Sequence, residues 1–289
     1  MQGKAVNLGS TAQSCAISQK SSKPISEDTV KKTSLFVVLM LIVVIGAATS
    51  SFAACTATSL LTTPGIWGIE SYGTGPGGLN NILMQVTFAS GGTFSGTEWQ
   101  SVAGSLTSFS ISGTWTMGLP VTDCQGTFKV TSPSTQTFNF ALNNAAKGGT
   151  IAETDANYTM AGFMVAQGTV TGGCSALTFK NKLFSLYSYG TIPAVGGTVS
   201  ATGEIKFGST GATFASLPTV TLDLATAGNF TLPATGTSSL SSDCTGAGVL
   251  TVTALGQSFD VDTVVVDAGK EALWIVTNAG DNVSGYFLQ

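Results

Sequence analysis

The sequence contains no histidine, and all 11 of its basic residues are lysines. Without histidine there is no imidazole base for a Ser-His or Cys-His pair, and no imidazole metal ligand. Without arginine there is no planar fork for phosphate or carboxylate groups. Charged residues make up only 9% of the chain. They form no basic stripe of the kind that binds a nucleic-acid backbone. These absences favour a non-enzymatic protein that binds no nucleic acid and carries no cofactor.

Apolar and small residues are abundant instead. Hydrophobic residues occupy 43% of the 289 positions, and 36 residues are glycine. This composition provides enough apolar side chains for a folded core, so the low charge does not indicate disorder. The length is comfortable for two domains.

An apolar segment near the N-terminus has the features of an export signal. Lys31-Lys32 precedes the apolar run 35–48, and Ser51-Phe52-Ala53 forms a small-x-small cleavage site. The run is shorter than the ~20 residues that a transmembrane helix needs. We expect residues 1–53 to be a cleaved signal peptide with a long polar n-region, and the mature protein to be periplasmic, extracellular or at the cell surface. The alternative is a lipoprotein acylated on Cys55, which would be its attachment to the membrane.

The rest of the chain contains one pattern written twice. Asp123-Cys124-Gln125-Gly126-Thr127 returns as Asp243-Cys244-Thr245-Gly246-Ala247, and other segments recur in the same order. Internal self-similarity of this kind indicates a tandem repeat. We expect one domain over residues 54–171 and a second over residues 172–289. Further matching segments are Ser71-Tyr72-Gly73-Thr74 with Ser188-Tyr189-Gly190-Thr191, and Thr137-Phe138-Asn139-Phe140 with Ser258-Phe259-Asp260-Val261.

Four cysteines follow the leader: Cys55, Cys124, Cys174 and Cys244. Four cysteines allow three pairings. Because Cys55 and Cys174 occupy equivalent positions in the two copies, as do Cys124 and Cys244, the repeat favours Cys55–Cys124 and Cys174–Cys244. Disulfides persist in oxidising compartments, which agrees with export.

Alternating apolar and polar residues predict short strands throughout both copies. In the segment 136–142, for example, Phe138, Phe140 and Leu142 share one face. Turn-forming Gly and Asn residues separate the runs, giving about eight strands in each copy. Short turns make successive strands antiparallel neighbours, and closure removes exposed sheet edges. We therefore predict an all-β fold of two tandem antiparallel meander β-barrels. The alternatives are two immunoglobulin-like β-sandwiches, or a transmembrane barrel.

Two motifs resemble known proteins. Gly113-Thr114-Trp115-Thr116, followed by the segment 123–127, is similar to a signature of uncharacterised secreted bacterial β-repeat proteins, a family without an assigned activity. Gly65-Ile66-Trp67 resembles the Gly-x-Trp that opens lipocalin barrels. The second copy has Lys182-Leu183-Phe184 there, and the arginine that packs on the lipocalin tryptophan is missing. The resemblance implies a calycin-like barrel shape and not a lipocalin ligand.

Aromatic side chains are the first candidates for a ligand site, although such residues on strands more often fill a core. The candidates are Trp67, Trp99, Trp115, Phe184 and Trp274. Three aspartates, Asp260, Asp262 and Asp267, are candidates for Ca²⁺, and an exposed strand face is the simpler explanation for them. Asp123 and Asp243 match in the two copies and are typical of Asx turns.

No motif in the sequence identifies a reaction. We expect an exported, non-enzymatic structural or interaction protein whose partner is unknown. The alternative is a lipocalin-like carrier that binds a small apolar ligand inside a barrel. A continuous apolar cavity on the order of a few hundred Å³ would favour the carrier.

Overall fold

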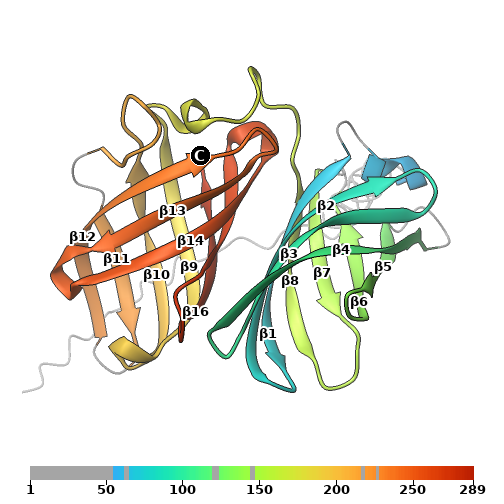
Figure 1. Ribbon diagram of the computed structural model, residues 1–289, viewed down its shortest axis with the longest axis horizontal. Helices are drawn as coiled ribbons and strands as arrows, with labels where there is room; N and C mark the ends of the chain where they lie inside the picture. Colours follow the sequence, from blue (N-terminus) through green and yellow to red (C-terminus); the bar gives the residue numbers. More distant parts are fainter. Residues whose placement is uncertain (1–54, 62–64, 119–123, 144–146, 216–218, 226–227) are drawn as a thin grey trace, which may run out of the picture. The chain divides into compact units, whose positions relative to one another are not determined.

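The computed structural model describes residues 55–61, 65–118, 124–143, 147–215, 219–225 and 228–289. These residues form two closed eight-stranded antiparallel β-barrels (Figure 1). The predicted fold class is therefore confirmed. The predicted signal peptide and Asp123 lie outside the described residues. The described part of the chain has no helix that is long and apolar enough to cross a membrane.

The strands of the first barrel follow one another around it in chain order, and the last strand pairs with the first to close the sheet. Closure satisfies the backbone groups that an edge strand would leave exposed. The strands are β1 (Ile66–Gly75), β2 (Gly78–Ala89), β3 (Thr93–Val102), β4 (Ser105–Met117), β5 (Gln125–Ser132), β6 (Gln136–Leu142), β7 (Gly148–Glu153) and β8 (Thr159–Ala166).

The second barrel repeats this order, with its last strand paired to its first. Its strands are β9 (Leu183–Ile192), β10 (Gly197–Lys206), β11 (Thr219–Leu224), β12 (Gly228–Leu240), β13 (Thr245–Val252), β14 (Gln257–Val266), β15 (Glu271–Val276) and β16 (Asn282–Leu288). Short 3₁₀ helices accompany the strands: η1 (Ala57–Leu61), η3 (Ala176–Phe179), η4 (Pro193–Val195), η5 (Thr253–Leu255) and η6 (Asp267–Gly269).

The β3–β4 connection shows how local sequence produces the meander. Val102 pairs with Ser105, which leaves Ala103 and Gly104 as a two-residue loop. Their φ angles are both positive, 48° and 80°. This combination is typical of the type I′ turn, whose twist matches that of the two strands it joins.

Both disulfides form as predicted, with Cα–Cα distances of 5.0 Å for Cys55–Cys124 and 5.1 Å for Cys174–Cys244. Each joins the segment before the first strand of a barrel to the start of its fifth strand. Cys124 and Cys244 both have positive φ, 53° and 68°, which is uncommon for a residue other than glycine. The two copies thus share the disulfide together with the backbone turn that presents it.

Aromatic rings fill the first barrel. Phe128 stacks on Phe138 with ring centroids 4.8 Å apart and meets Phe94 edge-on at 5.8 Å. The helix η1 covers one end, where the Trp67 indole donates a hydrogen bond to the carbonyl of buried Leu60 at 2.9 Å. In the second barrel, η3 contributes a buried phenylalanine to the core in the same way.

Hydrogen bonds beside the disulfides show which strand positions correspond. The Leu142 amide donates to the Cys124 carbonyl at 2.8 Å, as the Val265 amide does to Cys244 at 2.9 Å. Leu142 therefore corresponds to Val265, and Phe138, four residues earlier, to Val261. The sequence alignment, which matched Phe138 with residue 259, was wrong by two residues. A two-residue shift keeps every side chain on the same face of a strand, so alternation cannot detect it.

Candidate functional site

The five aromatic residues proposed for ligand binding lie in different environments. Trp67, Trp115 and Phe184 are buried in the closely packed barrel cores, and the Trp115 indole donates to two backbone carbonyls. Trp274 lines a cavity inside the second barrel. Trp99 packs against an apolar cluster outside the first barrel.

The three aspartates proposed for calcium are not brought together. Asp260 and Asp262 line an open groove of about 350 Å³ on the outer face of the second barrel, beside Ser and Thr side chains. Partial burial raises the pKa of Asp262. Asp267 lies in η6, with its carboxylate 4.0 Å from the Lys270 ammonium. Among the described residues, no three His, Cys, Asp or Glu side chains are grouped closely enough to hold a metal ion.

The second barrel encloses an apolar cavity of about 40 Å³, lined by sixteen residues that are all apolar except Ser188. Small-molecule pockets usually measure on the order of 300–1,000 Å³. The cavity is larger than the ~10–15 Å³ that one water needs, but a water would also require two to four polar partners. The polar groups of the lining residues are the Ser188 hydroxyl and the Trp274 Nε1, which has no hydrogen-bond partner among the described residues, so the cavity suits a very small and mainly apolar occupant.

The corresponding end of the first barrel is polar inside. Glu98 of β3, Gln136 of β6 and Glu153 of β7 point inward, and they are 0%, 4% and 7% exposed. Five of their oxygens are buried without a hydrogen-bond partner among the described residues: both carboxylate oxygens of each glutamate and the amide oxygen of Gln136. Ser71 and Asn80 are buried as well, and each adds one oxygen of the same kind.

Strand register places these polar residues at the positions that line the cavity in the second barrel. The corresponding pairs are Ser71 and Ser188, Asn80 and Val199, Glu98 and Val220, Gln136 and Phe259, and Glu153 and Val276. All five second-barrel members of these pairs line the cavity. The two copies therefore share one geometry and differ in chemistry, with apolar walls in one barrel and a cluster of oxygen atoms in the other.

Burial disfavours the ionised forms of both glutamates in this cluster. It raises the pKa of Glu98 from 4.5 to about 7; the adjacent Gln136 amide opposes the change, and the Glu153 carboxylate adds to it. Burial, assisted by the charge of Asp155, raises the pKa of Glu153 to about 7. The described lysines are exposed or half-buried, so no buried basic side chain in that part of the chain balances the pair.

A separate apolar cluster joins the two barrels, which belong to one compact unit. Leu83, on the outer face of β2, packs with four residues of β14 and β15, and all five side chains are fully buried. The four are Val264, Val266, Leu273 and Ile275. Strands that are buried on both faces read as continuous apolar runs, which is why this part of β14 shows no alternation.

Glu70 is the polar centre of this contact. It lies on the outer face of β1 and is 0% exposed. Its Oε1 accepts hydrogen bonds from the Tyr189 hydroxyl at 2.9 Å and the Ser284 hydroxyl at 2.6 Å. Burial raises the pKa of Glu70 to about 7, although both hydrogen bonds lower it. A carboxyl group is thus held mostly neutral between the barrels below pH 7.

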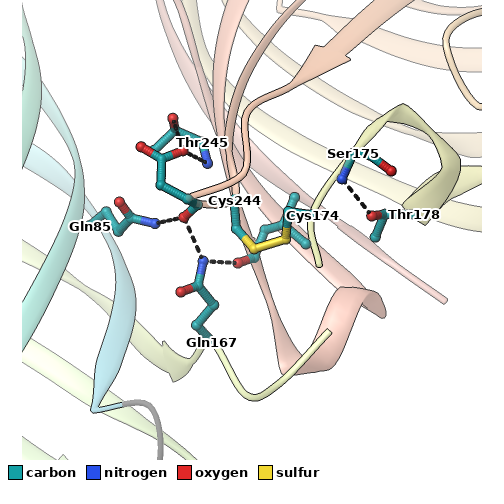
Figure 2. The surroundings of a disulfide bond; sticks show 9 residues. Gln85, Gln167, Cys174, Ser175, Thr178, Cys244 and Thr245 are labelled. Atoms are coloured by element: carbon teal, nitrogen blue, oxygen red, sulfur yellow. Dashed lines mark hydrogen bonds between the residues drawn. A yellow bond between two sulfur atoms is a disulfide. The ribbon is translucent and has the colours of Figure 1, made fainter. Parts of the chain in front are cut away.

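Two glutamines connect the barrels beside the second disulfide (Figure 2). Gln85 Nε2 donates to the Asp243 carbonyl at 2.6 Å, and Gln167 Nε2 donates to the carbonyls of Asp243 and Val265 at 3.2 Å each. The Asp243 carboxylate accepts from the Thr245 amide and hydroxyl. Asp243 therefore caps a turn, as the sequence indicates.

Four buried residues were not predicted as site residues from the sequence: Glu70, Glu98, Gln136 and Glu153. For three of them a signal was present, because each shares its strand face with a buried apolar neighbour: Glu98 with Phe94, Gln136 with Phe138, and Glu153 with Ile151. A polar residue that interrupts the inward face of a predicted strand is the pattern to search for.

No protein-family model and no curated protein matches the sequence. Among solved structures, the chain is similar to isotype 1 transferrin binding protein B from serogroup B Neisseria meningitidis, with 11% identity and a TM-score of 0.32 over 78% of this chain and 74% of that one. It is also similar to a candidate AttH protein from Nitrosomonas europaea, with 9% identity and a TM-score of 0.28 over 78% of this chain and 91% of that one.

Proposed function

We propose that the protein is an exported, non-enzymatic structural or interaction protein built from two barrels, each with its own internal disulfide. The observation that carries the proposal is the small size of the cavities found among the described core residues of the second barrel, together with the packed aromatic core of the first. Aromatic rings pack the core of the first barrel, and two apolar cavities of the second measure about 40 Å³ and about 30 Å³. A carrier of the lipocalin type needs an interior on the order of several hundred Å³. The described side chains inside the barrels therefore act as a stabilising core and do not form a cavity large enough for the ligand of a carrier.

Export is supported by the two disulfides, since such bonds persist in oxidising compartments. The leader predicted from the sequence agrees with this. A non-enzymatic role is supported by the burial of Glu98, whose side chain is 0% exposed and so does not face a substrate in solution.

Native mass spectrometry of the protein purified from its natural source tests the proposal. We expect the mass of the disulfide-bonded chain with no organic molecule attached in stoichiometric amount. An apolar fluorescent probe should likewise find no saturable site with one-to-one stoichiometry. A co-purified apolar molecule of several hundred daltons would contradict the proposal and restore the carrier function.

A second candidate function is the binding of a very small apolar molecule in the second barrel. Fifteen of the sixteen residues around the cavity are apolar, which is the lining that binds xenon or benzene in engineered cavities. Ala201 is one of them, and Ala201→Val would place two methyl groups in the space. Xenon binding that is present in the wild type and lost in this variant would support the second candidate. Equal signals from both proteins would reject it.

A further inference from the structure

We propose that Glu98, Gln136 and Glu153 bind a divalent cation, with calcium the ion that best fits their chemistry, inside the polar end of the first barrel. This proposal is independent of the structural or interaction role proposed above. The three residues come from β3, β6 and β7, so the closed sheet brings together side chains that are far apart in sequence.

Charge balance favours a divalent ion. Two carboxylates cannot both remain ionised in a low-dielectric interior unless a positive charge lies between them. The chain has no histidine or arginine, and its described lysines are exposed or half-buried. A single divalent cation neutralises both carboxylates, whereas a monovalent ion would leave one buried negative charge.

The donor atoms favour calcium. Five oxygens of Glu98, Gln136 and Glu153 are buried without a hydrogen-bond partner in the described part of the chain. Calcium takes six to eight oxygen ligands in flexible geometry, and water can complete the set. Nitrogen and thiolate ligands, which transition metals prefer, are not offered, because the chain has no histidine and all four described cysteines are in disulfides.

Gln136 shows that the site is more than a pair of acids. Its neutral side chain is 4% exposed, its amide oxygen has no partner among the described residues, and it lies beside Glu98. A buried amide oxygen without a donor is costly unless a ligand satisfies it. Carbonyl oxygens of Asn and Gln are regular calcium ligands.

The second barrel shows that the fold itself does not require these groups. At the corresponding positions it has Val220, Phe259 and Val276, and the barrel closes in the same way. Unpartnered oxygens at these positions of the first barrel lower its stability. A bound ion would offset that cost by coordinating them. Glu153 is the last residue of β7 and keeps 7% exposure, which puts the site next to a barrel end where an ion can enter.

Calcium titration of thermal stability tests the proposal on the full disulfide-bonded protein after removal of metal with a chelator. For an extracellular-type affinity of about 0.1–1 mM, 10 mM CaCl₂ should raise the melting temperature by roughly 3–10 °C. Glu98→Gln and Glu153→Gln should each abolish most of the shift. Both variants remove a buried charge, so folding is expected to persist. Native mass spectrometry should count one calcium per wild-type chain.

Two further variants make the result specific. Gln136→Leu removes only the neutral ligand and should reduce the rise in melting temperature that calcium causes. It therefore tests the site independently of the two glutamate variants. The double variant Asp260→Asn, Asp262→Asn on the outer groove should keep the full shift. The proposal is overturned if calcium gives no more stabilisation than NaCl of equal ionic strength. It is also overturned if Gln136→Leu responds like the wild type, or if the outer-groove variant loses the response.

Discussion

Replacing Glu70 with glutamine should change how the stability of the protein depends on pH. The Glu70 carboxyl lies between the barrels, fully buried, and burial raises its pKa from 4.5 to about 7. The folded state therefore holds a proton that the unfolded chain releases between these two values. Stability contributed by this proton is complete below pH 4.5 and is lost as the pH rises through 7.

The magnitude follows from the two pKa values of Glu70. A shift of 2.5 pKa units, from 4.5 to about 7, implies that the free energy of unfolding falls by about 2.5 kcal/mol between pH 5 and pH 8 through this one group. In Glu70→Gln this loss is absent. The glutamine oxygen can still accept from the Tyr189 and Ser284 hydroxyls, so the remaining differences from the wild type should be independent of pH.

Urea unfolding at pH 5 and pH 8, followed by tryptophan fluorescence, measures this effect. In the metal-free protein, burial also raises the pKa values of Glu98, Glu153 and Glu271 to about 7, so the wild type measured with a chelator should lose stability steeply over this range. Glu70→Gln should lose about 2.5 kcal/mol less. Glu204→Gln, at an exposed position of β10, is the matched control and should behave like the wild type. If Glu70→Gln and wild type differ by the same amount at both pH values, the account of Glu70 is refuted.

Three more substitutions test other parts of the structure. Cys124→Ser opens a loop of sequence separation 69, so the free energy of unfolding should fall by roughly 4 kcal/mol; equal urea midpoints for variant and wild type would contradict this. Ala201→Val adds two methyl groups to the cavity of about 40 Å³ and should raise the free energy of unfolding by about 1 kcal/mol. A lower melting temperature than that of the wild type would show that the cavity cannot hold them. Gly104 has a φ of 80°, and a Cβ on it would lie 2.3 Å from the Gly280 carbonyl carbon of the second barrel. Gly104→Ala should therefore lower the free energy of unfolding by on the order of 1–3 kcal/mol. It should also expose Trp99, which packs against the apolar cluster between the barrels, to acrylamide quenching. Unchanged quenching would mean that this contact between the barrels is unimportant.

The barrels and their disulfides could be predicted because both depend on patterns that the sequence displays. Alternation along the segment 136–142 defines two strand faces, and the repeat of Cys124 at Cys244 selects one cysteine pairing out of three. These signals are local, or are repeated at matching positions. They do not require knowledge of what lies across the barrel.

The contact between the barrels and the polar cluster could not be predicted in the same way. The run Val264-Val265-Val266 is apolar on both strand faces, and sequence alone does not say what covers the outer one. Glu98, Gln136 and Glu153 meet only after the sheet closes, so their proximity depends on shear and register. The two-residue misalignment of β14 shows how weakly a period-2 pattern determines register.

The two copies of the repeat meet through different faces, which limits how far the repeat can extend. The first copy contributes Leu83, and the second contributes Val264, Leu273 and Ile275. By strand register, Thr202 stands in the second copy where the first has Leu83, and Ala141, Thr150 and Ala152 stand in the first copy where the second has its three apolar residues. A head-to-tail association of this type is open-ended by symmetry. It would continue if every copy carried both of the apolar faces that form the contact. Here the corresponding outer positions carry alanine or threonine, so they offer no apolar surface like the one that joins the two barrels.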